Sequence, residues 1–188
     1  MFELAGLATF LDIFQKAFGL IEKCKDHRRQ LFKEIIDPVY TELSVVVGDY
    51  YSFFRRFRDD LSQAEMGNWV TVLEETKKQR EEIVLARNKV LGLTSPFLST
   101  SNIKSRKEDE LLYKFAKAIA GFFYASDDLE ESTEATSFFE FIDIIVEQGD
   151  ERGRKLVIDT VQKVLWRLER KWGRISAAYG ELRVFCLT

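Results

Sequence analysis

The sequence is poor in the residues that build metal and catalytic centres. Its 188 residues contain one histidine, His27, and two cysteines, Cys24 and Cys186, which lie far apart. Structural zinc sites draw four ligands from Cys and His at short spacings, and di-iron helical bundles need a Glu-x-x-His pattern twice. One histidine supplies neither pattern. We therefore expect no metal site and no cofactor, and the separated thiols are typical of a reduced, cytoplasmic compartment.

Signatures of catalysis and of phosphate binding are also lacking. The segment QGDERGR around Gly149 and Gly153 does not match a phosphate-binding loop or a dinucleotide fingerprint. Cys24 and His27 are spaced to touch on a helix, but KCKDHRR is typical of a charged helix surface and no oxyanion-stabilising loop is evident. We expect a non-enzymatic protein. An enzyme built from carboxylates and tyrosines stays open, because one sequence does not reveal their clustering.

The chain has no excess of basic residues. Its 28 Lys and Arg residues face 31 Asp and Glu residues, for a net charge of −3. The segment DYYSFFRRFRDDL, residues 49–61, interleaves aromatic and basic residues, as single-strand nucleic-acid binders do. Its aromatic residues fall on one apolar helix stripe, however, and Arg55 and Arg56 lie four residues before Asp59 and Asp60, a spacing that allows ion pairs. We expect no nucleic-acid partner.

Helix-forming residues dominate what is present. Hydrophobic residues make up 46% of the chain and charged residues 31%, while only two prolines, Pro38 and Pro96, interrupt it. The sequence predicts an all-α fold in one domain, residues 1–188, with loops near 92–105 and 126–134. The expected architecture is an elongated, mostly antiparallel bundle of about six helices, with long first and last helices.

The boundaries of the expected helices follow from apolar periodicity and capping signals. Asp37 is expected to cap a new helix and Pro38 to occupy its first position, so the first helix should end there. Ser105 and Glu108 match a capping box, and Gly149 with Asp150 should separate the last two helices. The stripe predicted to be buried on the second helix includes Phe53. The expected helices span residues 2–36, 38–61, 67–91, 106–125, 135–148 and 151–184.

Apolar residues on the expected last helix repeat at steps of four and three, the spacing of a coiled coil. We call this the seam, and it can pack within the bundle or against a second chain. Its candidate contact residues are Val161, Leu168, Trp172 and Ile175.

Two expected helices are apolar nearly all round, the one that opens the chain and the FFEFIDIIV stretch at 138–146. Burying both within one monomer is difficult, so we expect a protein partner or a homo-oligomer. A simple membrane span is disfavoured because Asp12 and Lys16 would lie near the bilayer centre. The candidate interface or membrane residues are Phe2, Leu7, Phe10, Leu11, Phe14, Phe18, Phe138, Phe139, Phe141 and Ile145.

A basic cluster follows the first apolar stretch, where it would suit an anionic membrane surface. Its members are Lys23, Lys25, Arg28, Arg29 and Lys33. A hydrophobic N-terminal helix, a basic segment and a helical bundle give a layout that resembles the helical membrane-disrupting domains of necroptosis-type and fungal incompatibility proteins. The resemblance covers about the first half of the chain and carries over no site residue.

The sequence therefore predicts a non-catalytic helical-bundle protein that acts through protein–protein contacts and self-associates. The alternative is a bundle that acts on or binds to membranes through its apolar N-terminal helix, with a peripheral location at the membrane. An enzyme is the third interpretation.

Overall fold

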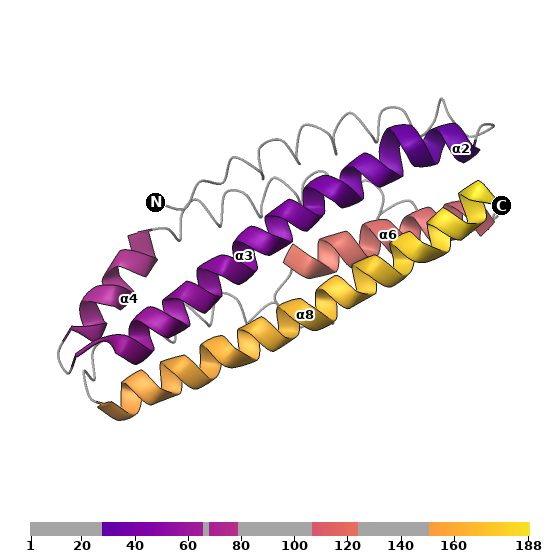
Figure 1. The fold of residues 1–188 in the computed structure, drawn as a ribbon. Coiled ribbons are helices and arrows are strands. Elements are labelled where there is room, and N and C mark those ends of the chain that lie inside the picture. Colours follow the sequence, from indigo (N-terminus) through magenta and orange to yellow (C-terminus); the bar gives the residue numbers. More distant parts are fainter. Residues whose placement is uncertain (1–27, 66–67, 79–106, 124–150) are drawn as a thin grey trace.

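A computed structural model describes residues 28–65, 68–78, 107–123 and 151–188 of the chain (Figure 1). These residues are helical apart from short links, and no strand occurs among them. The elements are α2 (Arg28–Leu31), the π-helix η1 (Phe32–Ile36), α3 (Asp37–Gln63), α4 (Trp69–Lys78), α6 (Lys107–Phe123) and α8 (Glu151–Leu187). The all-α class is thus confirmed for the described part, which covers neither the predicted loops nor the helix expected at 135–148.

The predicted helix break at Pro38 is wrong, because α2, η1 and α3 form one continuous helix (Figure 1). Ile36 and Asp37 keep helical dihedral angles, and the backbone N–H of Asp37 donates to the carbonyl of Phe32, five residues back. A proline inside a helix lacks the N–H for its own bond and its ring crowds the carbonyl four residues earlier. A turn of π-helix before Pro38 widens the backbone at that point, so the chain accommodates the proline without ending the helix.

Asp37 does not act as the predicted cap, since the start of α3 has no side-chain capping bond. Its carboxylate instead accepts a hydrogen bond of 2.5 Å from the hydroxyl of Tyr179, on α8. The side chain thus joins two helices rather than beginning one.

The long last helix is confirmed and extends three residues beyond its predicted end, to Leu187. One face of α8 is buried along its whole length. From Val157 to Cys186 the buried positions advance 29 residues in eight steps, about 3.6 residues per step, the period of a straight α-helix. The residues are Val157, Val161, Leu165, Leu168, Lys171, Ile175, Ala178, Leu182 and Cys186.

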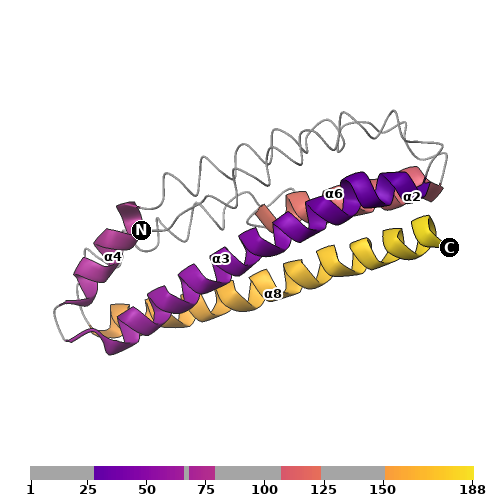
Figure 2. The same ribbon diagram turned by 45° about the horizontal axis from the view of Figure 1, so that its top comes forward.

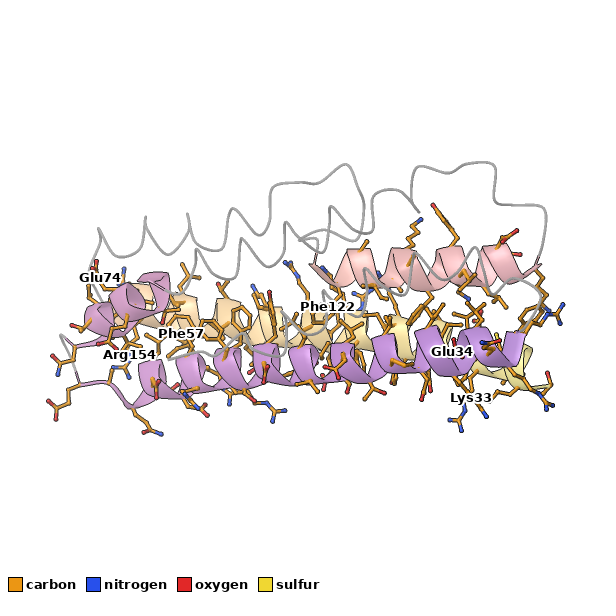
Figure 3. All side chains as sticks on the ribbon, turned by 90° about the horizontal axis from the view of Figure 1, so that it is seen from above. Lys33, Glu34, Phe57, Glu74, Phe122 and Arg154 are labelled. Carbon is orange, nitrogen blue, oxygen red and sulfur yellow. The ribbon has the colours of Figure 1, made fainter. Side chains whose placement is uncertain are left out.

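Helices α3 and α8 lie side by side and run in opposite directions (Figures 1 and 2). Near one end Tyr179 contacts Asp37, and at the other Arg154, on the first turn of α8, reaches the end of α3. The Arg154 guanidinium donates to the carbonyls of Ala64 and Ser62, at 2.8 and 3.2 Å (Figure 3). These carbonyls lie at the C-terminal end of α3, where a cation also complements the helix dipole.

Helix α6 packs against the C-terminal half of α8, and α4 packs against α3. Lys114 of α6 bonds both carboxylate oxygens of Glu181, at 2.6 and 2.7 Å. Phe122 of α6 meets Tyr50 of α3 edge-on, with ring centroids 6.0 Å apart. Figure 3 shows Phe57 and Phe122 directed into the layer between the helices, whereas Lys33 and Glu34 are directed away from it. One apolar core therefore joins all the described helices.

Helix α3 differs from the prediction in one buried aromatic residue and in one ion pair. Phe54 is buried where the stripe was predicted to pass through Phe53, which is half-buried. Arg58 rather than Arg55 pairs with Asp59, at 2.8 Å. Phe53 and Phe54 lie on either side of the stripe, so spacing alone does not decide which one enters the core.

The central position of α8 predicts a large cost for truncating Ile175, which is fully buried. Replacing Ile175 with Ala should lower the free energy of unfolding by about 2–5 kcal/mol, because it removes buried methyl groups and leaves a cavity. Urea unfolding followed by circular dichroism measures the change. Val184→Ala is the matched control, since Val184 is 63% exposed on the same helix and its truncation should cost less than about 0.5 kcal/mol. Equal losses in the two variants would contradict this core.

Candidate interaction surface

The side of α8 opposite its buried stripe is exposed and basic, and we call it the α8 outer face. At 100° per residue its basic residues fall within an arc of about 120°. Asp159 and Trp166 lie on the same arc. The basic members, all exposed, are Arg152, Lys155, Lys163, Arg167, Arg170 and Arg174.

Positive charge is concentrated on this helix. Helix α8 carries nine Lys and Arg residues against four Asp and Glu residues, in a chain whose net charge is −3. A surplus of one sign along a rigid element creates a local potential that attracts the opposite charge, and it does so even when the whole molecule is weakly acidic.

Trp166 is the large aromatic residue of this face and is 54% exposed. The guanidinium carbon of Arg170, one turn along, lies 4.9 Å from the centroid of the Trp166 ring. This geometry is a cation–π contact, which holds both side chains in place at the surface. Trp and Arg are the residues most often found to dominate the binding energy of protein interfaces.

Glu169, beside this face, contributes to the environment of Tyr51 on α3. The Tyr51 hydroxyl oxygen is buried and has no hydrogen-bond partner within the described part of the chain. Burial and the nearby Glu169 carboxylate raise the pKa of Tyr51 to about 12, against the opposing effect of Arg55. Tyr51 therefore stays protonated at neutral pH and is unsuited to act as a base or nucleophile.

An aromatic clamp joins α3, η1 and α8 on one side of their contact. The Tyr40 ring stacks between Tyr179 and Trp172, with centroids 3.9 and 5.1 Å away. The Tyr40 hydroxyl shares a hydrogen bond of 3.1 Å with Ser176, and Phe32 of η1 packs on Tyr179 at 5.6 Å. Both faces of the Tyr40 ring are occupied, so the clamp acts as a joint between helices.

The pKa of Tyr179 is raised, as is that of Tyr51. Its burial and its hydrogen bond to Asp37 raise the pKa of Tyr179 to about 12, since ionising the phenol would break that bond and place two negative charges together. Tyr179 is therefore neutral at physiological pH.

The structure places the predicted seam inside a single chain. Val161, Leu168 and Ile175 belong to the core, while Trp172 is half-buried and stacks on Tyr40. The neighbours of α8 in the described part are α2, η1, α3 and α6 of the same molecule.

The described members of the predicted basic cluster meet the C-terminal end of α8. Arg28 lies over the Phe185 ring at 4.4 Å, and Arg29 donates to the Leu187 carbonyl at 3.5 Å. Lys33 is exposed and directed outward (Figure 3). Cations at a helix C-terminus complement its dipole, so Arg28 and Arg29 contribute to packing within the bundle. Lys23 and Lys25 lie outside the described residues.

Other candidates also fall outside the described residues. They are His27, Cys24 and the ten apolar interface or membrane candidates between Phe2 and Phe18 and between Phe138 and Ile145. Within the described ranges, no group of three His, Cys, Asp or Glu side chains is placed to hold a metal ion. None of the helices in those ranges combines the length and apolar character needed to cross a membrane.

Comparisons with protein-family models, with curated proteins and with solved structures found no match. The α8 outer face must therefore be interpreted from its own geometry.

Sequence reasoning missed Trp166. Its signal is present in KVLWRLERKWGR, where a tryptophan falls off the apolar seam and basic residues recur around it at steps of three and four. Apolar periodicity predicts which side of a helix is buried. It does not predict the charge of the exposed side, which has to be counted separately.

The raised pKa values of Tyr179 and Tyr51 predict a loss of stability in alkali. Each ordinary pKa is 10.0 and rises to about 12 in the folded chain, so folding favours the protonated phenol. This contribution is full below pH 10 and disappears as the pH rises toward 12, because the unfolded chain releases these protons first. Unfolding free energies in urea, measured from about pH 8 to about pH 11, should fall with pH.

Tyr179→Phe should make this fall shallower, because it removes one of the two groups. It should also cost about 1 kcal/mol near neutral pH through the lost bond to Asp37. Tyr51→Phe should likewise reduce the slope, without removing a hydrogen bond made within the described residues. An unchanged slope in both variants would contradict the assignment.

Proposed function

We propose that this chain is a non-catalytic, all-α protein that acts through protein–protein contacts, with the α8 outer face as its principal contact surface. The observation that supports this proposal is the exposed Trp166, stacked with Arg170 and set among basic residues. Burying an exposed tryptophan and arginine pair in a partner supplies much of the energy of a typical interface.

In this proposal the buried side of α8 stabilises the fold and its outer face binds the partner. The buried stripe packs on α3 and α6, while the outer face contributes nothing to that core. A contact surface on a long helix anchored along its length loses little conformational entropy on binding, since its backbone is already fixed. The outer face therefore suits repeated, specific association.

The complete chain is proposed to be an elongated, mostly antiparallel bundle of about six helices in a cytoplasmic setting. Self-association through the apolar stretches 2–21 and 138–146 belongs to the same proposal, on the sequence argument that one monomer has difficulty burying both. A peripheral membrane role through the N-terminal stretch is the competing proposal. Vesicle binding by the full chain, compared with a version lacking residues 1–21, separates the two.

Charge reversal on the α8 outer face tests the contact function. We expect Lys163→Glu/Arg170→Glu to remove specific partners from the set that co-purifies with the tagged chain from its own cells. The reason is that both side chains flank Trp166 on this face and reversal turns attraction into repulsion. Quantitative mass spectrometry of the co-purifying proteins measures the loss.

Arg56→Glu/Lys117→Glu is the matched control, because it makes the same change of net charge at exposed positions of α3 and α6. Thermal unfolding should be similar for both variants and the parent. If both variants retain, or both lose, the same partners, the α8 outer face is not the contact surface.

A further inference from the structure

The spacing of charges on the α8 outer face carries more information than its sign. Lys163 lies three residues before Trp166 and Arg170 four residues after it, so a cation stands one helical turn to either side of the ring. Arg174 and Lys155 extend the same row in both directions. The row from Lys155 to Arg174 is about 29 Å long at 1.5 Å per residue.

One carboxylate interrupts this row. Asp159 is exposed on the same arc, seven residues or two helical turns before Trp166. A lipid surface or a nucleic-acid backbone presents negative charge throughout, so it would repel Asp159 wherever it met the row. A protein partner with charges of both signs can place a basic side chain opposite Asp159, whereas a uniformly anionic surface has no positive charge to place there.

The arrangement around Trp166 specifies the centre of the partner's surface. Arg170 covers part of the ring, at 4.9 Å from its centroid, and leaves the side chain 54% exposed. An apolar side chain can bury the remaining ring surface, and carboxylates one turn away on either side can reach Lys163 and Arg170. A helix supplies groups at this spacing of three and four residues along one face.

We propose that the α8 outer face binds an acidic amphipathic helix of a partner protein. This helix has an apolar residue over Trp166, carboxylates one turn to each side of it, and one basic residue two turns away, opposite Asp159. The inference rests on the proposed contact function and adds the chemistry and spacing of the partner. Each exposed ion pair contributes about 1.4-fold to 5-fold in affinity, so the pattern rather than one contact sets the specificity.

The test uses the full chain and two synthetic helical peptides of about 21 residues, a length that spans the row. The first has a central Leu, Glu residues at steps of three and four on one face, and a Lys seven residues from the Leu. The second has the same composition and net charge, with its Glu residues distributed around the helix. Fluorescence anisotropy of labelled peptides gives the dissociation constants at low and physiological salt.

We expect the patterned peptide to bind at least tenfold more tightly than its isomer. Lys163→Glu/Arg170→Glu should weaken it at least tenfold, whereas Arg56→Glu/Lys117→Glu should bind as the parent does. Asp159→Lys supplies the sharpest comparison, because it should reverse the preference between the patterned peptide and a version with Glu in place of its Lys.

Equal binding of the two isomers would overturn the spacing inference and leave the α8 outer face as a contact surface for acidic proteins. Tighter binding of the full chain to phosphatidylserine vesicles or to duplex DNA than to the patterned peptide would overturn the helical partner, if the Lys163→Glu/Arg170→Glu variant lost that binding. Concentration-dependent dimerisation abolished by the same variant would assign the face to a second copy, which also overturns it.

Discussion

Burial of one face of α8 against α3 and α6 is the contact on which the described structure depends. Helices α2, η1, α3 and α6 all meet this one helix, and its fully buried residues, Val161, Ile175 and Leu182 among them, lie at the centre of the core. Polar contacts also link these neighbours to α8. Arg154 holds the end of α3, Asp37 holds Tyr179, and Lys114 holds Glu181. Apolar burial supplies most of the stabilisation, and exposed pairs such as Lys114 with Glu181 add little to it.

The helix continues through Pro38 because burial in this core outweighs the local tendency of Asp-Pro to start a new helix. Asp-Pro is a good helix start by propensity, and the chain nevertheless stays helical through it. The described side chains on either side of the proline, Ile36 and Val39, are both buried in the same core, so ending the helix between them would expose apolar surface. One turn of π-helix costs less than that exposure, and Phe32 of the π-helix then packs on Tyr179.

Sequence reasoning recovered the helical class and the long last helix because both follow from residue periodicity, which is a local property. It did not recover the clamp of Tyr40, Trp172 and Tyr179, because stacking joins residues more than 130 positions apart. It placed Arg28 and Arg29 on the surface, where both are exposed, but it did not predict their contacts with Phe185 and Leu187, which depend on how α8 packs. Trp166 was within reach, because it departs from the seam in a helix with a surplus of basic residues, and counting charge by helix face would have found it.

The two faces of α8 differ in how much a substitution there affects the fold. Substitutions on the buried stripe alter packing and therefore stability, whereas exposed positions such as Lys163 tolerate change at a cost of a few tenths of a kcal/mol. The cation–π contact between Trp166 and Arg170 forms within one helix, so it does not depend on the register between helices. A surface of this kind can acquire a new charge pattern without disturbing the fold. In the proposed function, the order of Lys155, Asp159, Lys163 and Arg170 along the helix, rather than the shape of the bundle, sets the specificity of this face.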